Sequence, residues 1–301
     1  MIVQPRLASA VMLLRDRALP GQGQAQPVPY TEQNTDGGPG QGQAQPVPYT
    51  ERGIEVFMVR RVISSDFMPD VYVFPGGSVS RDDATAELSE GVCAPVALTS
   101  SDPEGRTALG KSIRAAAMRE LFEEAGVLLA YRGGAILSIP EEQVQYFEAY
   151  RRGFQERKGS LVEMAHAENL MLAADHLGYF AHWITPEGMP KRFDTHFFIT
   201  TAPASQQAEY DRVETSEGVW IAPSEALARF ERNEFPLVFA TIYQLRELAA
   251  FGSVQEALEH CATSYVPTRV PVLTQEDGKV RVFLEEDAGN TWEVPEHMTK
   301  S

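Results

Sequence analysis

The chain has 301 residues, 43% of them hydrophobic and 23% charged, and its formal net charge is −16. This length and apolar content allow a large buried core, and the acidic balance argues against a nucleic-acid partner, which would need clustered Lys and Arg. The two cysteines, Cys93 and Cys261, are too few and too far apart for a disulfide framework or a CxxC metal site.

No apolar run approaches the roughly 20 residues that span a bilayer. Residues 1–14 lack the basic segment, apolar stretch and small-residue cleavage site of a secretory signal. The sequence therefore predicts a cytoplasmic protein without a membrane partner.

The N-terminal part predicts two paired strands on either side of a low-complexity segment. Residues 8–15 and 54–61 are β-branched and apolar runs typical of strands. Between them, residues 20–32 and 39–51 are identical copies at a period of 19, rich in Pro, Gly and Gln. Two such copies do not make a solenoid, so residues 18–52 are predicted to form a flexible loop.

The most informative segment is a predicted helix over residues 107–125. Glu120, Glu123 and Glu124 are spaced i, i+3 and i+4, so they share one face of this helix. The opposite face is apolar, and Gly126 is placed to end the helix in the left-handed conformation. That apolar face carries Ala115, Met118, Phe122 and Ala125, flanked by Leu121.

The three glutamates indicate a metal site. Like charges this close repel one another and raise each other's pKa unless a cation lies among them. Oxygen ligands alone favour Mg²⁺ or Mn²⁺ over zinc, which prefers His and Cys. The simpler interpretation is an amphipathic helix with a solvated acidic face. The preceding Arg119 and the upstream run Phe74-Pro75-Gly76-Gly77 favour the metal site.

Residues 119–127 resemble the second half of the Nudix hydrolase signature, G-x5-E-x7-R-E-U-x-E-E-x-G-U, in which U is a bulky apolar residue. Every specified position of that half matches: Arg119, Glu120, Leu121, Glu123, Glu124, Gly126 and Val127. In the first half, Gly77 resembles the opening glycine, but Lys111 stands eight residues before Arg119, where the signature has Glu. Between Gly77 and Lys111 lie 33 residues in place of five.

The interrupted signature is similar to that of the insertion-bearing Nudix branch that includes coenzyme A diphosphatases, and so is the segment Phe193-Asp194-Thr195-His196-Phe197-Phe198. We therefore expect residues 78–106 to form an inserted loop, which their Ser, Thr, Asp, Gly and Pro content favours. Residues 141–157 and 161–175 have helical spacing and are expected to form an inserted helical pair within residues 138–176.

The remaining segments alternate between strands and helices. Strands are predicted over residues 71–74, 179–184, 193–201 and 213–221, and helices over 223–230, 237–251 and 254–261. A final hairpin pairs residues 270–274 with 280–284 around the turn Glu276-Asp277-Gly278. The pattern implies an α/β fold, an α/β/α sandwich with a mixed central sheet, and the resemblance implies that this sandwich is of the Nudix type. Residues 1–252 are expected to form the Nudix domain, and residues 253–301 a helical and hairpin extension packed on it.

The resemblance implies metal-dependent hydrolysis of the diphosphate bond in a nucleoside diphosphate linked to another group. A diphosphate resists hydrolysis because its negative oxygens repel the nucleophile, so an enzyme needs cations and an activated water. Glu120, Glu123 and Glu124 are the expected ligands of Mg²⁺ or Mn²⁺. Arg119 is expected to orient a carboxylate.

Further residues are expected around this cluster. Residue 74 should lead into a tight turn at Gly76 and Gly77, whose lack of a Cβ lets the backbone approach metal or phosphate. Glu217 lies where relatives often supply a further carboxylate, and it is the candidate general base; a solvated loop glutamate is the alternative. His182 and His196 lie on apolar strands, where packed histidines are expected.

Substrate choice rests on the stretch before the signature. Arg61 and the Phe-Pro-Gly-Gly run keep the spacing of a motif in the coenzyme A branch, while Asp66 and Asp70 replace its Arg and Gly. Coenzyme A or acyl-CoA, with Arg61 as a contact, is the leading substrate, and ADP-ribose, NADH or a dinucleotide is the alternative. A catalytically silent nucleotide-binding module and an interaction scaffold also remain open. The expected partner is a small nucleoside diphosphate derivative, and a homodimer is compatible with the sequence.

Overall fold

A computed structural model describes residues 3–17, 53–65, 67–96 and 107–295. The predicted duplicated loop, residues 18–52, lies outside the described residues. The central element is an eight-stranded sheet. Six strands follow the order β10-β2-β1-β9-β8-β11, and the other two, β3 and β4, pair with β2 and β1. The strands are β1 Arg6–Asp16, β2 Ile54–Arg61, β3 Tyr72–Val73, β4 Gly76–Ser78, β8 Gly178–Ile184, β9 Phe193–Thr201, β10 Thr215–Ile221 and β11 Thr268–Arg269.

The sheet is mixed. β1 runs parallel to β9 and β8 runs parallel to β11, whereas the pairs β1–β2, β2–β10 and β8–β9 are antiparallel. The predicted pairing of the two N-terminal strands is therefore confirmed. β1 lies inside the sheet, where both its edges are paired and its residues 8–14 are buried.

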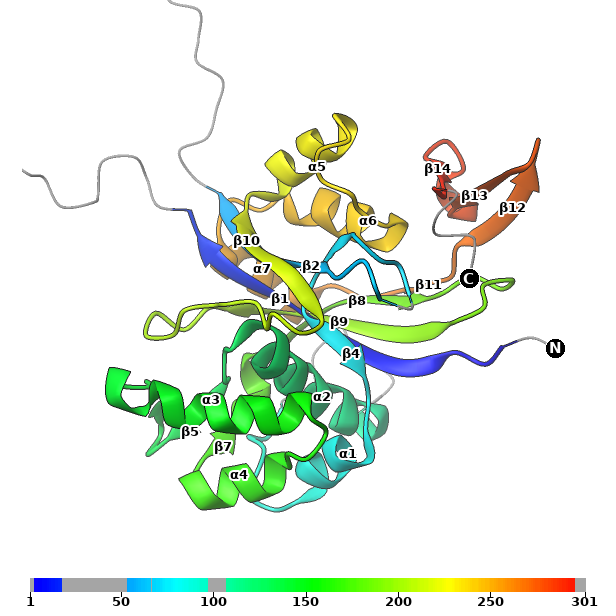
Figure 1. Cartoon of the computed structure of the whole chain (residues 1–301). Helices are drawn as coiled ribbons and strands as arrows, with labels where there is room; N and C mark the ends of the chain where they lie inside the picture. The colour runs from blue at the N-terminus through cyan, green and yellow to red at the C-terminus, as the bar shows by residue number, and fades with distance from the viewer. Residues whose placement is uncertain (1–2, 18–52, 66, 97–106, 296–301) are drawn as a thin grey trace, which may run out of the picture.

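Both faces of the sheet are covered by helices. Side chains alternate between the faces of a strand, and in β1 Val11 and Leu13 join one core while Met12 and Leu14 join the other. Figure 1 shows α1–α4 on the first face and α5–α7 on the second, which we call the α2 side and the α6 side. The predicted α/β/α sandwich is confirmed. The helices are α1 Arg81–Leu88, α2 Thr107–Ala125, α3 Glu141–Gln155, α4 Leu161–Glu168, α5 Pro223–Glu231, α6 Phe239–Leu248 and α7 Val254–Thr263.

Helix α2 has the predicted bounds because its sequence pattern and its end signal agree. The residues of the predicted apolar face, such as Met118 and Phe122, are buried in the core on the α2 side. Gly126 follows with φ of 69°, the left-handed conformation that glycine adopts without steric cost, and its N–H donates to the Phe122 carbonyl at 3.0 Å. The glutamate face is thereby fixed toward β4.

Two expectations about residues 76–96 are wrong, and residues 97–106 of the expected inserted loop lie outside the described residues. Gly76 and Gly77 do not form a turn; they begin β4, which pairs with residues 8–10 of β1. The expected inserted loop contains helix α1, which begins with a capping box: Ser80 accepts from the Asp83 N–H at 3.2 Å, and the Asp83 carboxylate accepts from the Ser80 N–H at 2.7 Å. A capping box supplies partners for N–H groups that a helix end leaves unpaired, so it stabilises this short helix.

The inserted helical pair is confirmed, but its second helix is shorter than predicted. α4 ends at Glu168 because Asn169 adopts a left-handed φ of 53°. The chain then forms β7, Met171–Leu172, and a 3₁₀ turn, Ala174–His176, where helix was expected up to Asp175. β7 pairs with β5, Ala130–Arg132, which also pairs with β6, Ala135–Ile136, in a small three-stranded sheet.

The C-terminal hairpin is confirmed. β12, Val272–Glu276, pairs with β13, Lys279–Phe283, around Asp277 and Gly278, both with positive φ, as a two-residue hairpin turn requires. After a 3₁₀ turn, Glu285–Asp287, β14, Trp292–Glu293, adds a third strand. Val282 and Leu284 are buried in the core on the α6 side. Within the described part of the chain, no helix is long and apolar enough to cross a bilayer.

Candidate functional site

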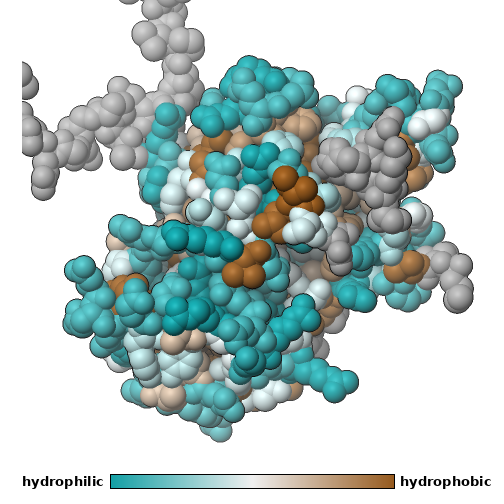
Figure 2. Space-filling view, in the orientation of Figure 1, coloured by the Kyte–Doolittle hydropathy of each residue, from teal (hydrophilic) through white to brown (hydrophobic). Residues whose placement is uncertain are grey.

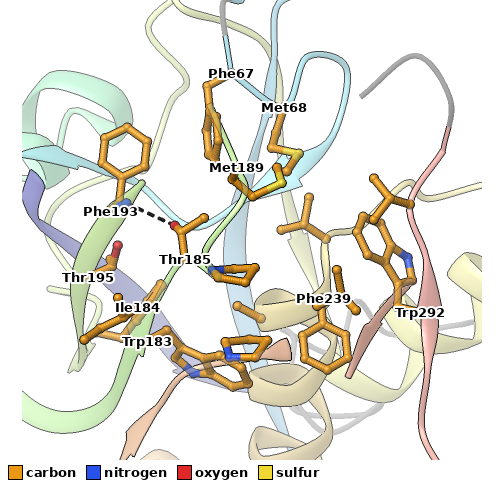
Figure 3. Close-up of a pocket in the computed structure, with 17 residues that line it drawn as sticks. Phe67, Met68, Trp183, Ile184, Thr185, Met189, Phe193, Thr195, Phe239 and Trp292 are labelled. Atoms are coloured by element: carbon orange, nitrogen blue, oxygen red, sulfur yellow. Dashed lines mark hydrogen bonds between the residues drawn. The ribbon is translucent and has the colours of Figure 1, made fainter. Parts of the chain in front are cut away.

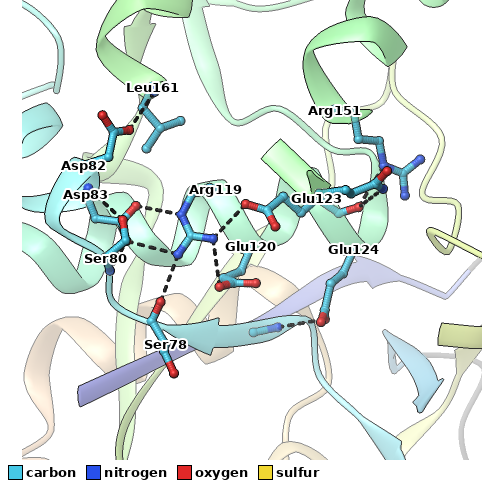
Figure 4. A network of polar contacts seen from close by, with 12 residues as sticks. Ser78, Ser80, Asp82, Asp83, Arg119, Glu120, Glu123, Glu124, Arg151 and Leu161 are labelled. Atoms are coloured by element: carbon cyan, nitrogen blue, oxygen red, sulfur yellow. Dashed lines mark hydrogen bonds and ion pairs between the residues drawn. The ribbon is translucent and has the colours of Figure 1, made fainter. Parts of the chain in front are cut away.

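Two of the three predicted metal-binding glutamates, Glu120 and Glu123, contact the guanidinium group of Arg119, and the third, Glu124, points to the backbone of β4 (Figure 4). Arg119 Nη1 donates to Glu120 Oε1 at 2.9 Å and to Glu123 Oε1 at 2.7 Å. Glu120 and Glu124 are buried, with 8% and 6% exposure, and the Glu123 side chain is 16% exposed. The contacts are in keeping with the predicted role of Arg119, because one guanidinium fixes two of the three carboxylates.

Asp83 completes the arrangement, and the sequence analysis missed it. Its two carboxylate oxygens accept from Arg119 Nε at 2.8 Å and Nη2 at 3.0 Å, a two-point contact that sets the plane of the guanidinium. Asp83 is fully buried. It is the sixth residue after Gly77, the position at which the signature has Glu. Counted forward from Gly77, the signature therefore continues to Asp83 before its interruption, whereas Lys111 takes the Glu position only when residues are counted back from Arg119.

The two glycines of β4 border the glutamates. The Gly76 N–H donates to Glu124 Oε2 at 3.0 Å. A Cβ at Gly77 would lie 2.6 Å from Cδ of Glu120, so a side chain there would displace that carboxylate. A Cβ at Gly76 would lie 2.5 Å from the Ala10 Cβ in β1. The lack of a side chain at Gly77 therefore lets the β4 backbone approach α2, and the lack of one at Gly76 lets it approach β1.

Burial dominates the electrostatics of the cluster. It raises the pKa of Glu120 to about 7, with Arg119 lowering that pKa and Glu123 raising it further. Burial also raises the pKa of Glu123, which Arg119 partly offsets, and it raises the pKa of Glu124 well above its usual range, to which Glu120 adds. The raised pKa values mean that the three carboxylates are costly to ionise together unless a further cation joins Arg119. The donor set consists of carboxylate oxygens, which suits a hard divalent ion such as Mg²⁺ or Mn²⁺.

Two loops place further charged groups near the cluster. Arg61, at the end of β2, lowers the pKa of Glu124, and Asp211 raises it; Glu214 raises the pKa of Glu123. The loops that carry these residues are joined, since the Val62 N–H donates to the Glu214 carbonyl at 3.0 Å. Arg61 also donates to Ser65 Oγ at 2.8 Å. The sequence analysis identified Arg61, but it missed Asp211 and Glu214, which no local motif marks.

The face of the molecule in Figure 2 is largely hydrophilic, and hydrophobic atoms gather near its centre. Two strongly exposed apolar side chains belong to the same two loops: Ile63 follows Arg61, and Val213 precedes Glu214, with 81% and 61% exposure.

Glu217, the predicted general base, contacts a different set of residues. Its carboxylate accepts from the Tyr72 hydroxyl at 2.6 Å and lies 3.9 Å from Arg60 Nη1. Among the described hydrogen bonds and ion pairs, none joins Glu217 to the three glutamates. Its side chain is 49% exposed and can therefore meet solvent or substrate. Its role as base remains a prediction.

The two strand histidines are buried, as predicted. His182 and His196 face each other across β8 and β9, with their rings stacked at 4.2 Å. Nε2 of His182 lies 2.5 Å from an Asp194 oxygen, and that of His196 lies 3.6 Å from the same oxygen. The Nδ1 atoms are paired with the hydroxyls of Thr268 and Tyr179 at 2.8 and 2.9 Å. These partners fix both rings within the packed sheet.

The stability of the metal-free protein should depend on pH through Glu120. Its folded pKa of about 7 exceeds the ordinary 4.5, so the folded state binds this proton more tightly than the unfolded state. Stability therefore falls as pH rises through this interval, by about 1–3 kcal/mol. Urea unfolding with EDTA across the interval checks this, and Glu120→Gln should flatten the slope. The exposed control Glu142→Gln should keep the wild-type slope of stability against pH. If Glu120→Gln also kept the wild-type slope, Glu120 would not be the group responsible.

Arg151 of α3 holds the C-terminal end of the glutamate helix. It is buried, and its Nε donates to the Glu123 carbonyl at 2.9 Å while Nη2 donates to the Glu209 carbonyl at 2.7 Å. Helix-terminal carbonyls lack intrahelical partners and carry negative partial charge. Arg151→Met should lower the unfolding free energy by about 1–3 kcal/mol, because the Glu209 carbonyl loses this donor and the Glu123 carbonyl keeps only Gln155 Nε2, at 3.2 Å. Urea unfolding beside the exposed neighbour Arg152→Met checks this; equal stability of the two variants would refute it.

Known proteins share this sequence and fold. The family model described as the NUDT19 Nudix domain matches residues 97–248, about half of the chain. The chain is 29% identical over 275 residues to the Gallus gallus protein named acyl-coenzyme A diphosphatase NUDT19, covering 76% of this chain and 71% of that protein. It is 28% identical over 247 residues to the Homo sapiens protein of the same name, covering 69% and 64%.

A solved structure shows the same fold. It is the crystal structure of a NUDIX hydrolase from Alicyclobacillus acidocaldarius, with a TM-score of 0.63 and 23% identity, covering 88% of this chain and 99% of that chain. The family match, the signature residues and their arrangement on α2 agree with one another. The chain therefore belongs to the Nudix hydrolases and, within them, to the family of the NUDT19 Nudix domain.

Proposed function

We propose that this Nudix hydrolase cleaves the diphosphate bond of coenzyme A or of an acyl-CoA. The observation that carries the proposal is the buried cluster of Glu120, Glu123 and Glu124, whose charge Arg119 only partly balances. The names of the Gallus gallus and Homo sapiens relatives support the substrate class. Addition of water to the diphosphate would give two phosphate monoesters, one with the adenosine part and one with the pantetheine part.

The three glutamates are proposed to hold Mg²⁺ or Mn²⁺. When bound, such an ion neutralises diphosphate oxygens and lowers the pKa of a coordinated water. Arg119 is a positioning residue, because it fixes Glu120 and Glu123 and is itself fixed by Asp83. The Gly76 N–H positions Glu124, and Gly77 leaves room for Glu120. Arg61 would offer positive charge to the substrate beside Glu124.

The proton acceptor is proposed from two carboxylates. Glu217 is one, with an exposed carboxylate near Arg60. Glu214 is the other, since it is exposed and its charge acts on Glu123. Asp211 is less suited, because its carboxylate already accepts from the N–H groups of residues 213–215 and from the Thr215 hydroxyl. Comparing the pH profiles of Glu214→Gln and Glu217→Gln distinguishes them: the base variant should lose the dependence on deprotonation of a carboxylate.

The domain division is also a proposal. Residues 1–252 would form the Nudix domain and residues 253–301 an extension of it. Its support is the packing of the extension: Val254, Ala257 and Cys261 of α7 are buried in the core on the α6 side, as are residues of the C-terminal hairpin.

The activity test uses the purified full chain with Mg²⁺, with Mn²⁺ or with EDTA. Coenzyme A, an acyl-CoA, NADH, ADP-ribose and a diadenosine polyphosphate serve as substrates, and mass spectrometry identifies the products. We expect ion-dependent cleavage of coenzyme A or acyl-CoA into the two phosphate monoesters. Cleavage of ADP-ribose, NADH or the dinucleotide with none of coenzyme A would overturn the substrate assignment. Binding without cleavage of any substrate would instead indicate a silent module.

A further inference from the structure

Two histidines and an aspartate on β8 and β9 form a second group of metal-binding residue types. Asp194 and His196 are two residues apart on β9, and His182 of β8 is the cross-strand partner of His196. The Nε2 atoms of both rings approach the same oxygen, Oδ1 of Asp194, at 2.5 Å from His182 and 3.6 Å from His196. One ligand atom from each of the three residues lies within 4.8 Å of the other two. The three side chains therefore converge on one point.

This group faces the α2 side of the sheet. Side chains alternate between the faces of a strand, and the neighbouring Trp183 and Thr195 line an apolar pocket on the α6 side (Figure 3). The ring of His196 contacts Tyr179, which belongs to the core on the α2 side. Both observations place the group on the same face as the glutamate cluster.

The group is nevertheless separate from the glutamate cluster. Ser9 of β1 pairs with Gly77 of β4 at one edge and with His196 of β9 at the other, and Gly77 lies directly beneath Glu120. Two strand spacings, about 10 Å along the sheet, therefore separate His196 from the residue beneath Glu120. The two ions of a two-metal catalytic site lie only roughly 4 Å apart. An ion at the histidines would therefore occupy a site of its own.

Both imidazole rings are held from behind by hydroxyl groups. Nδ1 of His182 is paired with the Thr268 hydroxyl at 2.8 Å, and Nδ1 of His196 is paired with the Tyr179 hydroxyl at 2.9 Å. A histidine that binds a metal through one nitrogen usually has a fixed partner at the other, which orients the ring. A hydroxyl oxygen can accept from Nδ1–H, and this tautomer leaves the Nε2 lone pair for an ion.

An ion fits between the three ligands after a small movement of Asp194. Ligand atoms around a tetrahedral zinc ion lie about 3.4 Å apart. The 3.6 Å between Asp194 and His196 is already close to this value, whereas the 2.5 Å between Asp194 and His182 must widen by about 1 Å. The two rings are buried, but the Asp194 side chain is 31% exposed. The carboxylate can therefore move, and a water molecule can complete the coordination.

We propose that His182, Asp194 and His196 bind a divalent transition-metal ion of the Zn²⁺ type, at a site independent of the proposed activity. Imidazole nitrogens suit such an ion, whereas the oxygen-only glutamate cluster suits Mg²⁺ or Mn²⁺. The net charge of −16 favours the approach of a cation from solution. The bound ion joins β8 to β9 and, through Thr268, orders the edge strand β11.

The test titrates Co²⁺, a spectroscopic substitute for Zn²⁺, into the full chain with Mg²⁺ in excess. Four-coordinate Co²⁺ with nitrogen ligands absorbs strongly in the visible range, whereas Co²⁺ held by carboxylates and water absorbs weakly. We expect strong absorption that saturates at one equivalent and that Zn²⁺ abolishes. His182→Gln and Asp194→Asn should each weaken this binding at least about 100-fold, and Thr268→Val, which removes only a hydroxyl, about 10-fold. His166→Gln, on the exposed side of α4, is the matched control and should bind like the wild type.

Absence of the strong absorption in the wild type would overturn the inference, because the three residues would then form only a hydrogen-bonded cluster. Equal binding by the wild type and both ligand variants would also overturn it. Circular dichroism checks that each variant is folded. Glu124→Gln should keep the wild-type absorption, and its loss there would place the ion at the glutamates. Hydrolysis is scored separately, so an inactive protein that shows the expected absorption would refute the proposed function and retain this site.

Discussion

Replacing Glu124 with glutamine is expected to lower kcat at least about 100-fold. The variant loses a negatively charged oxygen that would bind the divalent cation facing the diphosphate. The shape of the side chain is kept, and the Gly76 N–H can still donate to the amide oxygen. The folded protein should not be weakened. Burial raises the pKa of Glu124 well above its usual range, so the ionised carboxylate is costly to the metal-free fold and a neutral amide is not.

Product formation and urea unfolding, both near neutral pH, check the two parts of this prediction. Glu142→Gln, on the exposed face of α3, is the matched control and should retain activity and stability. Full activity of Glu124→Gln would remove this residue from the site. A large loss of stability would instead show that the carboxylate serves the fold.

Replacing Asp83 with asparagine is expected to cost about 3 kcal/mol in the free energy of unfolding, because it leaves the buried Arg119 with part of its charge uncompensated. Activity should fall about 10-fold to 100-fold, since Arg119 is the group that orients Glu120 and Glu123. The loss should appear mainly in kcat and in the ion concentration that gives half-maximal rate.

The neighbouring Asp82→Asn is the control that separates fold from function. Asp82 accepts from the Leu161 N–H and the Ser160 hydroxyl, both at 2.9 Å, and so holds the start of α4. Its replacement should lower stability while leaving the ion dependence of the rate unchanged. If the two variants had the same ion dependence, the positioning role of Asp83 would be refuted.

Local sequence patterns were sufficient to predict α2 and its glutamates. The apolar spacing, the three acidic residues and Gly126 all lie within one continuous segment, so its buried face followed from periodicity and its C-terminal end from the glycine. The strand pattern and the final hairpin followed for the same reason, because alternation and a two-residue turn are local signals.

Long-range contacts explain what the sequence analysis missed. Counting backward from Arg119 led to Lys111, whereas counting forward from Gly77 leads to Asp83, and only the contact with Arg119 across 36 positions decides between them. The capping box at Ser80 and Asp83 was a local signal for α1 that composition outweighed. Gly76 and Gly77 were assigned to a turn because their partners in β1 and α2 are remote in sequence. Glu214 and Asp211 approach the cluster through a loop pairing that no motif reveals.

The central claim is that Glu120, Glu123 and Glu124 bind a divalent ion. Titration of Mn²⁺ into the full chain, followed by the electron paramagnetic resonance signal of free Mn²⁺, tests it most directly. The wild type should remove free Mn²⁺ from solution, and both Glu120→Gln and Glu124→Gln should weaken that uptake at least about 10-fold, because each removes a charged ligand. No uptake by the wild type, with or without coenzyme A, or uptake equal in the wild type and both variants, would contradict the claim.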